Sequence, residues 1–163
     1  MVNAKDTGAS MRFFLRYWLP VLIWLAVIFV GSTDLMSAEH TSRFIGPFLR
    51  WFLPDIADAT IASVQLFVRK CAHLSEYAVL AALLCRAFRQ SIGRPWHAAF
   101  LAFFVAAASA VLDEFHQSFV ASRTGTAVDV AIDCGGALIG VVIYRSLGRT
   151  RATPKRRSAL PTP

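Results

Sequence analysis

The sequence has little charge, and its acidic residues are especially few. Only 17% of its 163 residues are charged and 10 are Asp or Glu, whereas 56% are hydrophobic and the mean hydropathy is +0.51. An average soluble domain has about 25% charged residues and a smaller apolar fraction. The composition therefore excludes an ordinary soluble domain and predicts one small membrane domain.

Cysteine is also scarce, and several familiar motifs are missing. Cys71, Cys85 and Cys134 form neither a CxxC pair nor a zinc-ribbon spacing, and helical geometry turns Cys71 and Cys134 away from the ionisable faces of their helices, so we expect no disulfide. The chain contains no GxSxG motif and no phosphate-binding loop, so covalent hydrolysis and nucleotide chemistry have no support. Residues 31–38 lack an Ala-x-Ala cleavage pattern, which predicts that the first apolar segment is retained as a membrane helix.

Four apolar segments are long enough to cross a bilayer, at residues 13–31, 68–87, 96–117 and 128–147. About 20 helical residues span the hydrocarbon core. We therefore predict an all-α, polytopic membrane protein whose four transmembrane helices occupy a domain at residues 12–147. The polar segments 1–11 and 148–163 have too few apolar residues to form a core, and we expect both to be disordered and cytoplasmic.

The longest loop, residues 32–67, contains an aromatic pattern. Phe44, Phe48, Trp51 and Phe52 recur with the spacing of one helical face, and Pro54 should end that helix. We predict a short interfacial helix in this first external loop, serving either as a plug or as a lid. Residues 55–61 are expected to form a turn into the second span.

A net charge of +7 raises the question of nucleic-acid binding. The basic residues instead follow the membrane topology, because a cytoplasmic location of both termini puts most of them on one side, including Arg86, Arg89 and Arg94 between the second and third spans. The charge thus predicts orientation, and we expect no nucleic-acid partner.

Three of the predicted spans carry ionisable side chains, each of which costs about 2.5 to 3.5 kcal/mol at the bilayer centre on insertion scales. With the predicted orientation, all of them fall in the outer turns of the second, third and fourth helices and should converge at one level. The motifs are Arg69-Lys70-x-x-His73-x-x-Glu76-Tyr77, Asp113-Glu114-x-His116-Gln117 and Asp129-x-x-x-Asp133-x-x-Gly136.

Helical geometry places these side chains on shared faces. Arg69, His73 and Glu76 form a narrow stripe with Lys70 and Tyr77 on its flank. In the third span, a separation of four residues puts two polar side chains on one face with an acidic neighbour beside them. These are Asp113, Gln117 and Glu114.

The fourth span has its own stripe, formed by Asp129, Asp133, Gly136 and Gly140. Gly136-x-x-x-Gly140 is a small-xxx-small pattern, which permits close approach of another helix. This face should therefore pack inward, with its two carboxylates facing protein.

Several chemistries remain open for this set. One is a divalent metal, for which donors are offered by His73, Glu76, Asp113, Glu114 and His116. The basic Arg69, Lys70 and Arg123 disfavour a cation and the spacing matches no known ligand pattern, so we predict neither a metal nor a cofactor. These three basic residues could instead hold a phosphate or carboxylate. His73 beside carboxylates could also move protons in hydrolysis or transport. An interhelical ion-pair network without a ligand is the structural alternative.

The ordered motifs resemble the VanZ-like family of small bacterial membrane proteins, from about residue 21 to residue 144. The resemblance rests on Arg69-Lys70-Cys-Ala-His73-Leu-Ser-Glu76-Tyr77, Asp113-Glu114-Phe-His-Gln117-Ser-Phe119, Arg123 and Asp129-Val-Ala-Ile-Asp133-Cys-Gly-Gly136, with Ser32 as a weaker match. The family usually has asparagine where this chain has Asp133. The resemblance implies an inner-membrane protein of the cell envelope and a role of the glycopeptide-resistance type, but no defined reaction.

Our leading hypothesis is an outward-facing pocket that binds an anionic envelope lipid or lipid-linked precursor, with chemical modification of it left open. Arg69, Lys70 and Arg123 would hold the anion, with other polar groups orienting it or moving protons. His73, Glu76, Asp113 and Glu114 are the candidate catalytic residues, and Tyr77, Gln117, Asp129 and Asp133 complete the ligand-binding set. The alternatives are a proton-coupled transporter or gating protein, and a non-catalytic structural subunit.

Overall fold

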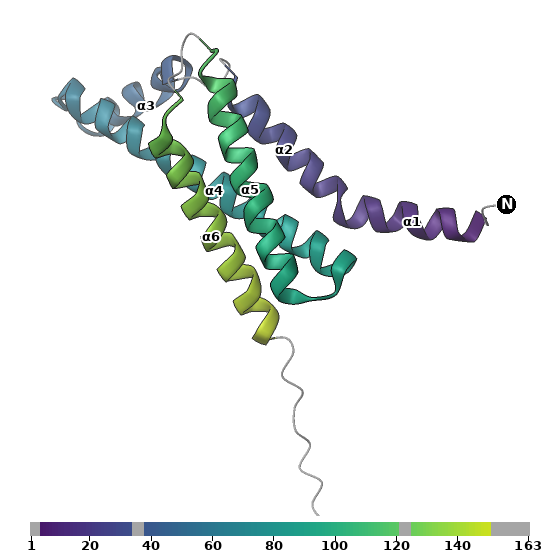
Figure 1. Cartoon of the computed structure of the whole chain (residues 1–163). Helices are drawn as coiled ribbons and strands as arrows, with labels where there is room; N and C mark the ends of the chain where they lie inside the picture. Colours follow the sequence, from purple (N-terminus) through teal and green to yellow (C-terminus); the bar gives the residue numbers. More distant parts are fainter. Residues whose placement is uncertain (1–3, 34–37, 121–124, 151–163) are drawn as a thin grey trace, which may run out of the picture.

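The computed structural model describes residues 4–33, 38–120 and 125–150, and all regular structure in these residues is helical. Helices α4, α5 and α6 pack side by side, while α2 lies against one side of this group and α3 lies at one end of it (Figure 1). The helices long and apolar enough to cross a membrane are Gly8–Gly31, Asp58–Ile92, Pro95–Gln117 and Ala127–Gly148. The predicted all-α class with four candidate spans is confirmed.

The first span consists of α1 (Ala4–Tyr17) and α2 (Leu19–Gly31), joined by a bend at Trp18. Pro20 lies in the first turn of α2 and has no backbone N–H to donate to the preceding turn of α1. The helix axis therefore bends here, and α1 points away from the bundle (Figure 1). We expected disorder for residues 1–11, but residues 4–11 belong to helix α1. Residues 1–3 lie outside the described part. The described tail residues 148–150 are likewise helical, as the end of α6.

Helix α4 (Asp58–Ile92) is much longer than the predicted segment 68–87. Its 35 residues include no Gly or Pro, so helix formation continues from the end of the α3–α4 loop to Gly93, over about 52 Å. Residues 58–61, expected to lie in a turn, are its first residues. Gly93 ends the helix with a left-handed φ of +75°. Helix α5 (Pro95–Gln117) begins at Pro95, and proline is well suited to the first turn of a helix because the N–H that it lacks would have no partner there.

The short helix of the first loop is confirmed as α3 (Ala38–Phe52), which ends two residues before Pro54. Its aromatic face is exposed, with Trp51 77% accessible. Arg50 forms an ion pair with Asp58 that ties the end of α3 to the start of α4. The interfacial position of α3 remains a prediction.

Helix α6 (Ala127–Thr150) packs against α4 at very short range. A Cβ atom added at Gly136 or Gly140 would overlap the carbonyl oxygen of Leu74 or Ala78, respectively, whereas one added at Gly135 would meet nothing within 4 Å. The predicted inward orientation of the Gly136-x-x-x-Gly140 face is confirmed. This contact sets the depth at which the carboxylates of α6 face α4.

Small residues also line the contact of α5 with its neighbours. Ala102, Ala106 and Ala110 are fully buried at intervals of four residues, one above another on one face. Large apolar side chains on the other face, such as Phe100 and Phe104, are exposed. This reversal, with small residues inside and large ones outside, is typical of helices packed within lipid.

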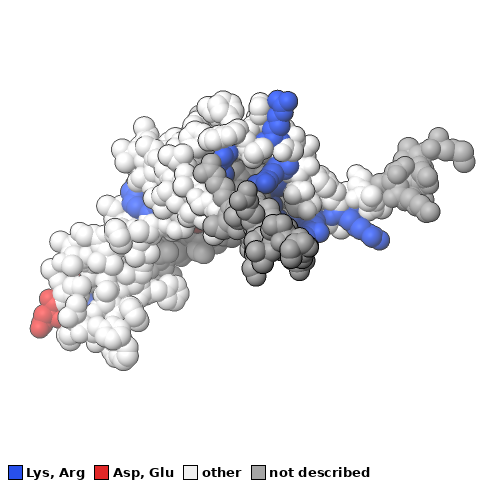
Figure 2. Space-filling view, turned by 90° about the horizontal axis from the view of Figure 1, so that it is seen from below, with Lys and Arg blue, Asp and Glu red and all other residues white. Residues whose placement is uncertain are grey.

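Basic side chains gather at the end of the bundle formed by the α4–α5 connection and the end of α6. Figure 2 views the molecule from this side and shows several Lys and Arg groups on its surface, and Arg89 and Arg94 are exposed there. Arg145 stacks over Trp96, with its guanidinium carbon 3.6 Å from the ring centroid. The predicted orientation makes this the cytoplasmic end.

Labelling of single cysteines would test that orientation. In a chain with its own cysteines replaced, a membrane-impermeant maleimide added to intact cells is expected to label Ser118→Cys at the end of α5, but to label Arg94→Cys only after lysis. Both positions are exposed, so access decides the result. Labelling of position 94 alone in intact cells would reverse the topology.

Candidate functional site

One end of the bundle collects nearly all of the predicted site residues. They come from helices that are far apart in sequence, and they lie at the end opposite the arginines of the α4–α5 connection. Arg123 lies outside the described residues. Helix α4 contributes Arg69, Lys70, His73, Glu76 and Tyr77, helix α5 contributes Asp113, Glu114 and Gln117, and helix α6 contributes Asp129 and Asp133.

Most of these side chains form a buried polar layer across α4, α5 and α6. Gln117, Tyr77 and Asp133 have no accessible surface. The remaining buried members are each less than a tenth exposed, namely His73, Asp113, Glu114 and Asp129. The layer is internal to the protein, as expected for ionisable groups at membrane depth.

Asp113 connects α5 to the end of α2. The Ser32 hydroxyl donates a hydrogen bond to Asp113 Oδ1, and Gln117 Nε2 donates one to Asp113 Oδ2 at 2.9 Å. Ser32 is itself buried. Ser32 was not among the predicted site residues, although it was the weaker match in the family resemblance.

Thr126 is a second residue that sequence reasoning missed. It caps α6: its hydroxyl donates to Asp129 Oδ2 at 2.8 Å and accepts from the backbone N–H of Asp129 at 3.1 Å. Its own backbone N–H donates to Glu114 Oε2 at 2.9 Å. Thr126-x-x-Asp129 resembles a helix capping box, so this signal was present in the sequence.

Lys70 forms an ion pair with Asp129 that joins α4 to α6. The side chains are 30% and 10% exposed, so the pair is largely screened from water. Each charge compensates the other, and the Lys70 ammonium is engaged inside the layer.

His73, Glu114 and Asp133 meet at the centre of the layer. His73 Nδ1 lies 3.5 Å from Asp133 Oδ1, and one donor atom from each residue can be chosen so that all lie within 4.8 Å of one another. His73 Nδ1, Glu114 Oε1 and both carboxylate oxygens of Asp133 are buried without a hydrogen-bond partner among the described residues. Unpartnered polar atoms are therefore concentrated at this point.

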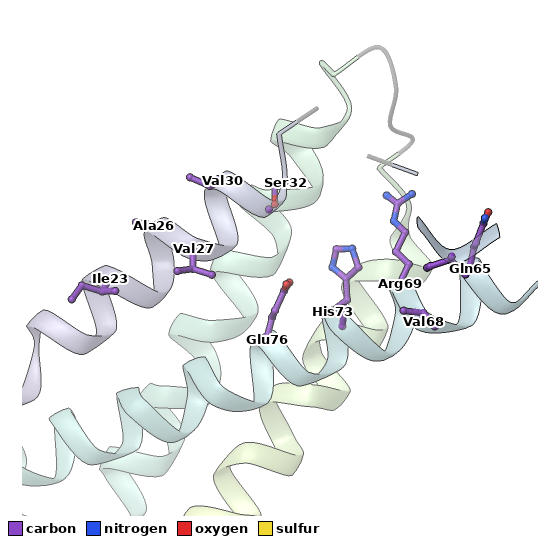
Figure 3. A pocket seen from close by; sticks show the side chains of 13 residues that line it. Ile23, Ala26, Val27, Val30, Ser32, Gln65, Val68, Arg69, His73 and Glu76 are labelled. Atoms are coloured by element: carbon purple, nitrogen blue, oxygen red, sulfur yellow. The ribbon is translucent and has the colours of Figure 1, made fainter. Parts of the chain in front are cut away.

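A cavity of about 610 Å³ opens between α2 and α4, next to this layer. One wall is apolar and belongs to α2, with Ile23, Val27 and Val30. Figure 3 shows Arg69, His73 and Glu76 projecting from α4 on the side that faces α2. The cavity has the character expected for an amphiphile, since an apolar wall faces a polar stripe.

The structure thus divides the predicted site into two environments. Arg69, His73 and Glu76 line the cavity. The other described residues of the predicted set belong to the layer behind it, and His73 is the predicted residue that takes part in both. Ser32, which was not predicted, also lines the cavity and donates to Asp113 of the layer. Sequence periodicity placed the side chains on common faces, but it did not distinguish the cavity wall from the interior.

Comparison with known proteins identifies the family. No curated protein and no solved structure matches the chain. The model of the VanZ/LLP1 family matches residues 17–148, a range that includes the ionisable motifs, the second half of the first candidate span and all of the other three. The resemblance inferred from the motifs is confirmed, and the chain belongs to the VanZ/LLP1 family of membrane proteins.

Proposed function

We propose that the protein binds the anionic headgroup of an envelope lipid or lipid-linked precursor in the cavity between α2 and α4. The observation that carries this proposal is the composition of the cavity wall, where an arginine and other polar side chains face the apolar side chains of α2. Acyl or prenyl chains would lie along α2, and the phosphate would lie against Arg69. A lipid-linked precursor also agrees with the resistance role that the resemblance implies.

Arg69 is the strongest candidate for the anion contact. Its guanidinium stays charged at any physiological pH and can hold a phosphate through two parallel hydrogen bonds. No carboxylate in the described part of the chain forms an ion pair with Arg69, whereas Lys70 is already paired with Asp129. Arg69 is therefore the available cation on the described cavity wall.

The neighbouring polar groups support a ligand with a polar headgroup. His73 and Glu76 lie on the same face of α4 as Arg69 and line the same cavity. Both can orient hydroxyl groups or move a proton. The buried carboxylates Asp113 and Asp129 would act behind them, holding α2 and α6 in place through Ser32 and Lys70.

The bundle core supports binding over proton conduction. The stretches 78–85, 98–112 and 134–143, which continue the helices toward the arginine-rich end, contain no Asp, Glu, Lys, Arg or His. Their inward-facing residues are apolar, including Leu80, Leu84 and Ala106. A proton path through these described residues has no carboxylate, imidazole or amine to relay the proton, so the transport alternative has weaker support.

Replacing Arg69 by glutamine should weaken lipid binding by at least tenfold, because the phosphate loses a charged, bidentate partner. Binding would be measured by native mass spectrometry of the protein in phosphatidylcholine nanodiscs doped with phosphatidylglycerol or with a polyprenyl phosphate. Stronger retention of one of these lipids would identify the source of the phosphate.

Arg50→Gln is the matched control, since Arg50 is exposed and pairs with Asp58 outside the cavity. It should bind both lipids as the unsubstituted chain does. Equal binding by Arg69→Gln and the unsubstituted chain, with both inserted and monodisperse, would contradict the proposal.

A further inference from the structure

We propose that His73, Glu114 and Asp133 form a binding site for a divalent cation of the Zn²⁺ or Mn²⁺ class. This site goes beyond the proposed lipid cavity, because Glu114 and Asp133 do not line that cavity. The three ligands come one each from α4, α5 and α6. A cation would join the three tightly packed helices at a single point.

The distances among the side chains suit a shared ion better than a hydrogen bond. The 3.5 Å from His73 Nδ1 to Asp133 Oδ1 exceeds the usual length of an N–H···O bond. Two ligands of one tetrahedral Zn²⁺ are about 3.3 Å apart, since each lies about 2.0 to 2.2 Å from the metal. All three donor atoms lie within 4.8 Å of one another, so small side-chain rotations bring them into that geometry.

The unpartnered oxygens are the second, independent observation. Asp133 is 0% exposed and neither of its carboxylate oxygens has a hydrogen-bond partner among the described residues. Glu114 Oε1 is also buried without a partner. Buried polar atoms are almost always bonded, so these oxygens need a ligand, which a cation supplies.

Other buried carboxylates of the layer do not show this deficit. Asp113 accepts hydrogen bonds from Ser32 and Gln117, and Asp129 accepts from Lys70 and Thr126. Among the buried carboxylates of the layer, the unpartnered oxygens therefore belong to Glu114 and Asp133, and the Tyr77 hydroxyl of the same layer also has no hydrogen-bond partner among the described residues.

Charge balance favours a divalent ion. Two carboxylates and a neutral imidazole carry a charge of −2, which one divalent ion neutralises in the interior. In the sequence, the basic residues Arg69, Lys70 and Arg123 disfavour a cation. In the structure Lys70 is paired with Asp129, and Arg69 projects into the cavity, so neither supplies the missing partner for Asp133.

The donor set indicates the class of metal. One imidazole nitrogen with two carboxylate oxygens suits Zn²⁺ or Mn²⁺, whereas an all-oxygen set would suit Ca²⁺ or Mg²⁺. The arrangement is not visible as a sequence motif, because each ligand lies on a different helix and the spacings between ligands reflect the connecting loops.

Metal binding to the whole chain tests the proposal. Protein purified in detergent and stripped with a chelator would be dialysed against Zn²⁺ or Mn²⁺, and its metal content and affinity would be measured by elemental mass spectrometry and chelator competition. We expect one ion per chain, and at least a tenfold loss of affinity in Asp133→Asn and Glu114→Gln, which keep the side-chain shape.

Asp113→Asn is the matched control, because it changes a buried carboxylate whose oxygens already have partners. It should bind the metal within about threefold of the unsubstituted chain. The proposal would be overturned if the folded, unsubstituted protein did not bind the metal stoichiometrically, and the carboxyl groups of Glu114 and Asp133 would then be expected to share a proton. Equal metal affinity in Asp133→Asn and the unsubstituted chain would also overturn it.

The lipid proposal can fail independently. Metal binding is measured on delipidated protein, and Arg69→Gln should lose the lipid while keeping the metal. Metal binding without lipid binding would contradict the lipid proposal and support the cation site. Lipid binding without metal binding would contradict the cation site and support the lipid proposal.

Discussion

Replacing Gly140 by alanine is expected to lower the free energy of unfolding by about 3 kcal/mol and to shift much of the protein to an aggregated or loosely packed form. The added Cβ would overlap the carbonyl oxygen of Ala78 and approach its carbonyl carbon to 2.7 Å. These are backbone atoms of α4 and no flexible side chain can move aside, so α6 must shift away. Gly136→Ala should behave alike, because its Cβ would overlap the backbone of Leu74.

Gly135→Ala is the control for this prediction, since it makes the same chemical change on the same helix. Its Cβ would meet nothing within 4 Å, and alanine is a better helix former than glycine, so stability should be unchanged or raised by about 0.5 kcal/mol. Thermal unfolding in detergent, followed by size-exclusion fluorescence, would measure all three variants. Similar melting temperatures for Gly140→Ala and Gly135→Ala would show that α4 and α6 do not pack as closely as described.

Replacing Lys70 by methionine is expected to cost about 2 to 4 kcal/mol. The substitution keeps much of the apolar stem but leaves Asp129, which is 10% exposed, without its opposite charge. Thr126 still donates one hydrogen bond to that carboxylate, so the loss should be smaller than for a fully isolated charge. The melting temperature of the purified variant would measure it.

The double variant Lys70→Met with Asp129→Asn distinguishes a broken ion pair from lost packing. Removal of both charges should recover more than half of the stability lost in Lys70→Met, because no uncompensated carboxylate remains. Additive losses in the double variant would instead mean that the two residues do not interact.

The motifs of the second, third and fourth spans predicted the polar layer because its side chains follow helical periodicity. Asp129, Asp133, Gly136 and Gly140 lie on one stripe, and glycine at two of these positions leaves room for a neighbouring backbone. Such local patterns are readable because a helix repeats every 3.6 residues whatever surrounds it. The all-α class was predicted from the length of the four apolar segments, and the family was predicted from the resemblance of the ordered motifs.

Other features could not be predicted in this way. The ends of α4 depend on the absence of Gly and Pro between Asp58 and Ile92, which hydropathy does not measure. The partnership of Ser32 with Asp113 crosses 81 positions of the chain. No periodicity within one helix indicates such a partner, because it depends on how two helices meet.

By itself the sequence determined that the chain is a helical membrane protein, which faces of its helices are polar, and where α6 has room for a neighbouring backbone, since these follow from hydropathy, helical repeat and side-chain size. Only the tertiary structure decided that Arg69 lines a cavity together with residues of α2, and that Lys70 forms an ion pair with Asp129. It also decided that Asp133 lies next to His73 while neither of its carboxylate oxygens has a hydrogen-bond partner among the described residues. The reason is that partnership depends on distances between helices, and these are set by packing across three interfaces at once.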